Sequence, residues 1–139
     1  MQAFKNLIDG EWVDASDGAT FTTENPAQKG DVIGSFPSAT KEDTRRAVEA
    51  ARAAAAGWAN MPPPARGAIL DKASRIVEAR MDEYAAILTR EEGKTRAEAT
   101  GEVTRARDIL RFYAGEGWRM GGDVLPSNTS GSLLYTRRE

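Results

Sequence analysis

Any chemistry carried out by these 139 residues has to use oxygen groups or amines, because the sequence contains no cysteine and no histidine. A thiol nucleophile, an imidazole base and a Cys/His metal cluster are therefore excluded within this stretch. The remaining candidates are the side chains of Asp, Glu, Lys, Ser, Thr and Tyr. The search for a site thus begins with the carboxylates.

Glu98 and Glu102 lie four residues apart in a segment with helical periodicity, which places both carboxylates on one face. Paired carboxylates can perform acid–base chemistry or hold a cation. In the structural alternative, Glu98 completes a capping box that begins at Thr95, and Glu102 is a solvated residue paired with Arg105. Spacing alone leaves both interpretations open.

Two glycine-containing stretches resemble nucleotide-binding loops only in part. The "EEGKT" segment (91–95) lacks the required glycine at position 88, where the chain has Leu88. The "GEGWRMGG" segment (115–122) closes a predicted helix, whereas a dinucleotide loop opens one. We expect a helix end at the first segment, and close helix packing at Gly115 and Gly117.

Composition places the chain among soluble globular proteins. Apolar residues make up 40% and charged residues 29%, a balance that argues against disorder. Nineteen basic and twenty-one acidic residues leave a net charge of −2, so electrostatics gives no reason to expect nucleic acid or an anionic membrane as a partner. No signal peptide and no run of about 18 apolar residues is present, so a cytoplasmic location is expected.

The first forty residues are predicted to form strands and turns. Asp9 and Gly10 separate two short apolar-containing runs, and glycine accepts the positive φ of a tight hairpin turn. Asn25 and Pro26 start a second turn, which Gly30 closes between two further strands. The sequence therefore predicts two hairpins before residue 40.

The next segment changes to a helical pattern and predicts three helices in all. Thr40 is the expected N-cap of the first, with Asp43 in a near capping-box position. The prolines at 62–64 suit the entrance of the second, which is expected to continue to Gly93 at a left-handed C-terminal position.

A second capping box opens the third helix. Thr95 and Glu98 form this box, and Gly121–Gly122 ends the helical segment. A polar loop over 123–131 and a terminal strand candidate over 132–139 are expected to follow. The predicted class is α/β, in the order hairpins, three helices, strand.

Apolar stripes predict that every helix packs against a neighbour. The stripe of the first helix consists of Thr44, Ala47, Val48, Ala51, Ala55 and Trp58. Such small residues bury little area, so this helix must lie close to another element. Trp12, Trp58 and Trp118 are expected in the core, with an interface as the second choice. Few strands are available to cover three stripes, which indicates that partner surface is absent from this chain.

Seven short signatures occur in an order that resembles a known family. They are "NLIDGEWVDA", "ENPAQKGDVIGSFPSAT", "EDTRRAVEAARAAAAGW", "ARGAILDKASRIVEAR", "EEGKTRAEATGEV", "RFYAGEGWRMGGDVLP" and "YTRRE". Together they resemble the N-terminal quarter to third of the aldehyde dehydrogenase superfamily, over essentially the whole chain. The fifth and sixth signatures look most like the semialdehyde dehydrogenases, including those acting on succinic or 2-oxoglutaric semialdehyde.

The resemblance implies an incomplete domain of a larger enzyme. Residues 1–121 would be the opening hairpins and three helices of a Rossmann-like NAD(P)-binding domain, and residues 122–139 the start of a β-stranded oligomerisation segment. The parent enzyme would be a homo-oligomer, a dimer or a tetramer, that oxidises an aldehyde or semialdehyde to the carboxylic acid with NAD or NADP. The family's cysteine nucleophile, glutamate, asparagine and cofactor loop lie outside this chain. The resemblance therefore assigns no catalytic or cofactor-binding residue, and the free chain is predicted to be inactive.

One family site is implied inside the chain. Many members hold a monovalent cation with backbone carbonyls and one carboxylate, and the matching positions here are Thr23, Glu24 and Glu102. Many relatives carry Asp where this chain has Glu102. Two other hypotheses stay open: a non-catalytic short protein that docks on a full-length dehydrogenase, and an unrelated binding module.

Overall fold

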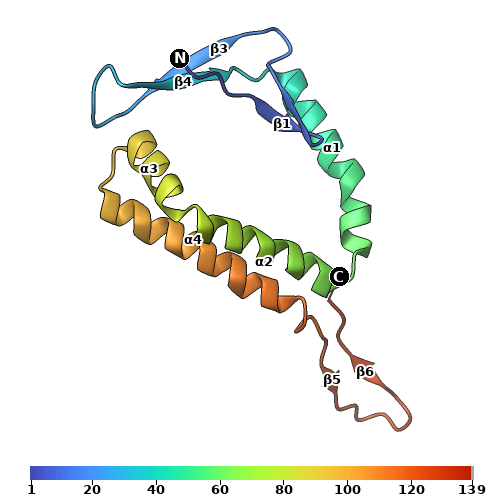
Figure 1. Ribbon diagram of the computed structural model, residues 1–139. Coiled ribbons are helices and arrows are strands. Elements are labelled where there is room, and N and C mark those ends of the chain that lie inside the picture. Colours follow the sequence, from blue (N-terminus) through green and yellow to red (C-terminus); the bar gives the residue numbers. More distant parts are fainter. Residues whose placement is uncertain (139) are drawn as a thin grey trace.

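The structure is a computed structural model that describes residues 1–138, so Glu139 lies outside the described residues. The described chain forms three two-stranded antiparallel sheets and four helices (Figure 1). The elements are β1 (Asn6–Ile8), β2 (Glu11–Val13), β3 (Thr20–Glu24), β4 (Val32–Pro37), α1 (Lys41–Asn60), α2 (Pro63–Ala79), α3 (Met81–Glu92), α4 (Arg96–Glu116), β5 (Val124–Leu125) and β6 (Leu134–Tyr135). The hairpins and α1 form one arm, α2 to α4 form a second, and the β5–β6 ribbon projects beyond them.

Both N-terminal hairpins confirm the turn predictions. Asp9 (φ 53°) and Gly10 (φ 79°) have positive φ, as a primed two-residue turn between β1 and β2 requires. In the β3–β4 turn, Ala27 N donates to the Asn25 side-chain oxygen at 3.0 Å, and Gly30 has a φ of 82°. These short-range signals therefore set the strand register.

The predicted helix caps are confirmed, whereas α4 ends at Glu116, before the predicted end at Gly121–Gly122. Thr40 and Asp43 cap each other's backbone N–H groups at the start of α1, and Thr95 and Glu98 do the same at the start of α4. Gly93 ends α3 in the left-handed region, at φ 73°.

The second predicted helix divides at Arg80, so the described chain has four helices where the sequence predicts three. Arg80 has φ −115° and ψ 23°, outside helical values. Its N–H still donates to Ile76 O at 3.1 Å, and its carbonyl accepts from Tyr84 N at 3.0 Å. The apolar stripe continues across the break, and Arg80 is neither proline nor glycine, so periodicity gave no sign of it.

The predicted polar loop over 123–131 contains a strand. Val124–Leu125 form β5, which pairs with Leu134–Tyr135 of β6. Asp123 N donates to the Thr136 hydroxyl at 2.9 Å, and Thr136 N donates to Asp123 O at 2.9 Å. Two residues are too short to show alternation, so only the cross-strand partner reveals this strand.

The main core lies between α3 and α4 and is made of small side chains. Ala85, Ala99 and Val103 are buried there, and Val77, Met81, Tyr84 and Leu88 pack around them. Close approach between α2 and the α4 end depends on glycine: a Cβ at Gly117 would lie 2.4 Å from Pro63 O. Packing at Gly117 is therefore confirmed. The same prediction is wrong for Gly115, whose nearest neighbour is the Arg119 side chain in the turn that follows α4.

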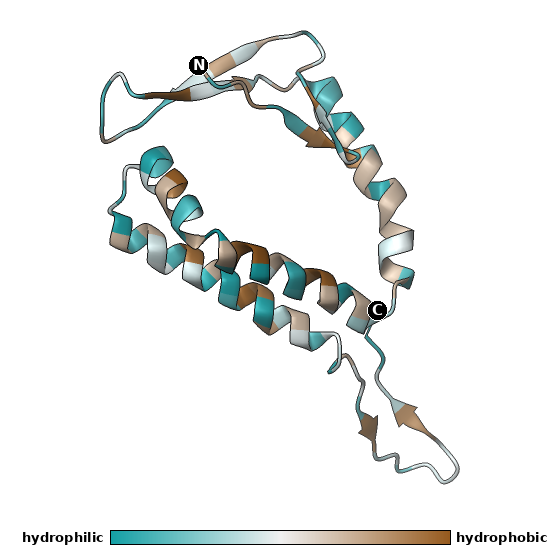
Figure 2. Cartoon of the chain, in the orientation of Figure 1, coloured by the Kyte–Doolittle hydropathy of each residue, from teal (hydrophilic) through white to brown (hydrophobic). Residues whose placement is uncertain are grey.

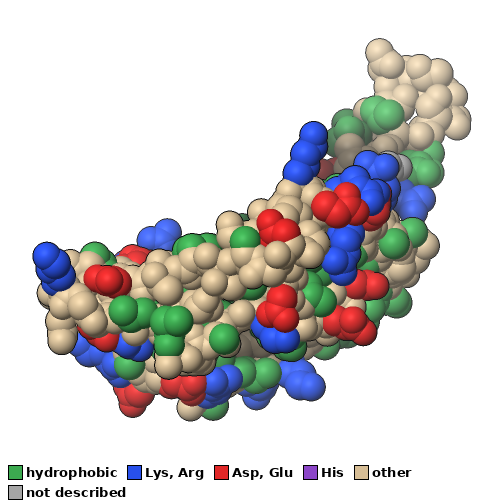
Figure 3. All heavy atoms as spheres, turned by 90° about the horizontal axis from the view of Figure 1, so that it is seen from above, with side chains coloured by type: hydrophobic (Ala, Val, Ile, Leu, Met, Phe, Trp, Pro, Cys, Tyr) green, Lys and Arg blue, Asp and Glu red, His purple; other side chains and the backbone are tan. Residues whose placement is uncertain are grey.

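Much apolar surface stays exposed in the described chain. Trp12, Trp58 and Trp118 are all exposed, the last at 81%, so the prediction that they lie in the core is wrong. Figure 2 shows hydrophobic residues along α2 and on both strands of the β5–β6 ribbon, and Figure 3 shows hydrophobic side chains at the surface among charged ones. No helix of residues 1–138 is both long and apolar enough to span a bilayer.

Candidate functional site

The β3–β4 turn and the α3–α4 loop meet at one junction. A Cβ at Gly93 would lie 3.0 Å from the Pro26 ring and 3.1 Å from Ala27 N, so only glycine allows this approach. Beside it, the Arg90 guanidinium pairs with Asp31 Oδ1 at 2.6 Å. This ion pair lowers the Asp31 pKa to about 2, chiefly through the hydrogen bond from Arg90. The turn that follows Thr23 and Glu24 is thereby fixed against the helices.

Thr23 and Glu24, at the end of β3, provide different groups to this junction. The Thr23 hydroxyl oxygen is buried and has no hydrogen-bond partner among residues 1–138, which suits a polar ligand. Glu24 is exposed, and its Oε2 accepts from Gly30 N at 3.2 Å. The Glu24 carboxylate therefore joins the two ends of the β3–β4 turn.

Glu102 is paired with a lysine, and not with Arg105 as the sequence suggested. Lys94 Nζ lies 2.7 Å from Glu102 Oε1 and 2.5 Å from Glu92 Oε2. The loop between α3 and α4 brings Lys94 to Glu102 from eight residues away, which helical spacing alone does not reveal. Hydrogen bonds to Glu102 and then Glu92 raise the Lys94 pKa.

The cation hypothesis for Thr23, Glu24 and Glu102 therefore stays a prediction. The Thr23 hydroxyl has no partner in the described chain and fits a polar ligand. The Glu102 carboxylate, in contrast, is already paired with the ammonium of Lys94. Within residues 1–138, no group of three or more Asp, Glu, His or Cys side chains is arranged to hold a metal ion. A metal cation at Glu102 Oε1 would have to displace the Lys94 ammonium from that oxygen.

Glu98 has the structural role that the sequence offered as an alternative. Its Oε2 accepts from the Thr95 hydroxyl at 2.8 Å and from Thr95 N at 3.0 Å. Both hydrogen bonds lower the Glu98 pKa, and the one from the Thr95 hydroxyl has the larger effect. Glu98 is therefore bound to the helix cap at Thr95, whereas Glu102 is paired with Lys94.

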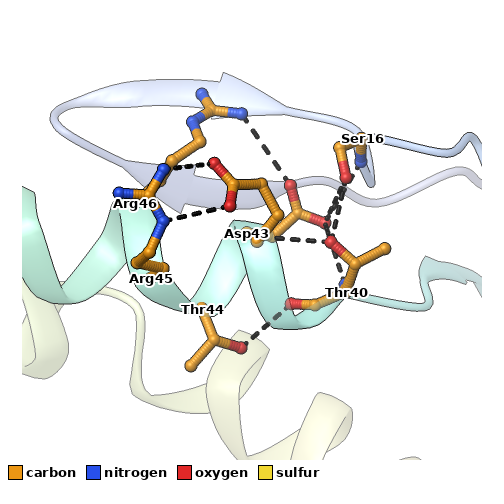
Figure 4. A network of polar contacts seen from close by, with 7 residues as sticks. Ser16, Thr40, Asp43, Thr44, Arg45 and Arg46 are labelled. Atoms are coloured by element: carbon orange, nitrogen blue, oxygen red, sulfur yellow. Dashed lines mark hydrogen bonds and ion pairs between the residues drawn. The ribbon is translucent and has the colours of Figure 1, made fainter.

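Asp43 is the most buried carboxylate of the described chain, at 1% exposure (Figure 4). Its Oδ2 accepts from Thr40 N and from the Thr40 hydroxyl, both at 2.9 Å, and from Ser16 N at 3.1 Å. The backbone bonds from Thr40 and then Ser16 lower its pKa to about 2. Asp43 thus ties the segment between β2 and β3 to the start of α1, and it positions the hairpins.

An open groove of about 570 Å³ runs along α4. It is lined by Gly101, Thr104, Arg105, Asp108, Ile109, Phe112 and Tyr113. Arg105 makes no ion pair with any other residue of the described chain, while Ile109 and Phe112 on the same face are exposed. Sequence reasoning missed this groove because it treated Arg105 as the partner of Glu102. The spacing of Arg105, Ile109 and Phe112 was the available signal.

Comparison with known proteins decides the family. The sequence model of the aldehyde dehydrogenase family matches residues 12–139. The chain belongs to the aldehyde dehydrogenase family. The recognised resemblance and the mixed α/β class are therefore confirmed.

Relatives of this aldehyde dehydrogenase chain include several semialdehyde enzymes. It is 45% identical over 135 residues to the alpha-ketoglutaric semialdehyde dehydrogenase of Bacillus subtilis (strain 168), covering 97% of this chain and 28% of that protein. It is 36% identical over 133 residues to the NADP(+) succinate-semialdehyde dehydrogenase of Escherichia coli (strain K12), covering 96% and 27%. The chain thus spans slightly more than a quarter of the length of these relatives.

Solved structures show the same arrangement. A succinate-semialdehyde dehydrogenase from Burkholderia pseudomallei superposes with a TM-score of 0.88 at 39% identity, covering 95% of this chain and 27% of that one. An NAD-dependent aldehyde dehydrogenase from Sinorhizobium meliloti gives 0.88 at 33% identity, with coverage of 95% and 27%. The junction and the groove therefore belong to a segment that keeps its conformation in longer family members.

Proposed function

We propose that this chain is the N-terminal part of an NAD(P)-dependent aldehyde dehydrogenase that oxidises a semialdehyde, a molecule with a carboxylate at the end opposite its aldehyde, to a dicarboxylic acid. The similarity to alpha-ketoglutaric semialdehyde dehydrogenase over 97% of the chain carries this proposal. The enzymes compared above that are named for a substrate act on semialdehydes of this kind.

The α4 groove supports this substrate class. A semialdehyde presents a carboxylate and a short apolar chain, so its site needs one cation and an apolar wall. Arg105 supplies a planar guanidinium that can bind a carboxylate with two parallel hydrogen bonds. Ile109 and Phe112 supply exposed apolar surface along the same groove. We assign Arg105 the recognition of the distal carboxylate.

A chimera tests both the semialdehyde activity and the role of Arg105. The matching segment of the Bacillus subtilis relative is replaced by residues 1–139, and NAD(P)H formation is measured with succinic semialdehyde and with butanal, which has the same number of carbons and no carboxylate. We expect turnover of the semialdehyde. We expect R105L to lower kcat/KM for the semialdehyde about 10- to 100-fold through the loss of charge-assisted hydrogen bonds, and to leave butanal unchanged.

The matched control is R52L, which removes an exposed arginine of α1 that makes no ion pair within the described chain. It should leave both substrates unchanged. Equal losses on succinic semialdehyde and butanal in R105L would contradict a role in carboxylate recognition. A chimera that folds and oxidises neither aldehyde would contradict the enzymatic proposal itself.

The remaining family features are part of the same proposal. NAD or NADP would bind to residues outside this chain, residues 1–121 would pack on the nucleotide-binding sheet, and residues 122–139 would enter the oligomerisation segment. The isolated chain is expected to form no NAD(P)H with any aldehyde. The alternative, a non-catalytic protein that docks on a dehydrogenase, predicts instead that the purified chain binds an intact family member.

A further inference from the structure

Lys94 places one positive charge between two carboxylates at the junction of the β3–β4 turn and the helices. Its Nζ is 2.5 Å from Glu92 Oε2 and 2.7 Å from Glu102 Oε1. The Lys94 side chain is 17% exposed, whereas both glutamates are about half exposed. The lysine is therefore the least exposed side chain of the three.

Backbone geometry fixes Lys94 in this position. Gly93 takes left-handed values at the end of α3, and the Thr95 cap starts α4 two residues later. Pro26 and Ala27 of the β3–β4 turn abut Gly93, so the chain on either side of Lys94 is held. The backbone at the base of the Lys94 side chain is thus fixed, so placing the ammonium at Glu102 requires ordering only the side chain itself.

A lysine ammonium and a monovalent metal ion can both neutralise the carboxylates at this junction. Each carries one positive charge, and each is bound by oxygen atoms at short range. Two carboxylates that both lie at hydrogen-bonding distance from one ammonium are close enough to repel one another unless a cation lies between them. In the described chain the Lys94 ammonium is the cation that lies at hydrogen-bonding distance from both Glu92 and Glu102.

We infer that the Lys94 ammonium takes the place of a metal cation at Glu102, so that this junction is stable without bound Na⁺ or K⁺. The inference does not depend on the proposed enzymatic activity. It differs from the cation site implied at Thr23, Glu24 and Glu102, because it assigns the positive charge at Glu102 to the chain itself.

Thermal unfolding of the full chain in NaCl, KCl and choline chloride at equal ionic strength tests this. We expect the same Tm for the wild type in all three salts, since none of the cations has a free carboxylate pair to enter. In K94M the pair becomes free, and we expect Na⁺ or K⁺ to raise Tm by about 3–6 °C over choline. The double variant K94M/E102Q should lose that rise.

The control is K72M, which removes a lysine of α2 that forms no ion pair in the described chain, and it should unfold alike in all three salts. Line broadening of ²³Na NMR by the protein gives a second measurement, expected in K94M and absent in the wild type and in K94R. A cation-specific Tm rise or broadening in the wild type would overturn the inference whether or not K94M folds. A folded K94M that treats the three salts alike would overturn it as well.

Discussion

Replacing Gly67 by alanine tests whether α2 and α4 owe their close packing to the absence of a side chain. A Cβ at Gly67 would lie 2.3 Å from Ala114 O and 3.3 Å from the Ala114 carbonyl carbon. Both are backbone atoms, so the helices must separate by about 1 Å to restore van der Waals contact. Overpacking of this kind costs about 1–3 kcal/mol. Alanine gains about 1 kcal/mol over glycine as a helix former, which offsets part of that cost.

Gly101→Ala provides the matched control, because Gly101 lies on α4 with nothing within 4 Å of its Cβ position. This variant should gain helix propensity alone, about 1 kcal/mol. The difference in unfolding free energy between G101A and G67A therefore isolates the packing cost, and we expect about 1–3 kcal/mol. Urea unfolding followed by far-UV circular dichroism measures both. A G67A chain as stable as G101A would refute the close-packing argument.

Three other perturbations give distinct readouts. Arg66 donates to Met61 O at 2.8 Å and Ala59 O at 3.0 Å, so R66A should free the end of α1, cost about 1–2 kcal/mol and speed amide exchange in the last turn. Asp43 has a folded-state pKa of about 2 against an ordinary 3.8, so its stabilisation is present above pH 4 and is lost as pH falls toward 2; unfolding free energies in D43N should show a shallower acid decline. The exposed apolar faces should make the isolated chain self-associate, and sedimentation velocity that shows only monomer at tens of micromolar would contradict this.

Features controlled by a few neighbouring residues were predictable from the sequence. The hairpin at Asp9–Gly10 and the cap at Thr40 act over four residues or fewer, so residue type alone determines them. The break at Arg80 and the pairing of Lys94 with Glu102 were not predictable. The break at Arg80 leaves the apolar periodicity intact, so the sequence pattern does not reveal it. The Lys94–Glu102 pair joins two residues that the α3–α4 loop brings together. At the candidate site, the sequence assigned the wrong partner to Glu102, which pairs with Lys94 and not with Arg105.

The large exposed surface explains why the predicted turns and helix caps were correct while the predicted burial of the tryptophans was wrong. The chain exposes 10363 Å², whereas a compact monomer of 15.1 kDa exposes about 7,100 Å². The excess, about 3,300 Å², is surface of one partner alone, so a matching interface would bury about twice that area in total, as the largest obligate interfaces do. The same conformation occurs in family members more than three times as long, at a TM-score of 0.88. We therefore propose that the exposed apolar residues of α1 and α2 are core faces whose partners lie outside residues 1–138, in agreement with the proposal that they pack on the remainder of a dehydrogenase subunit.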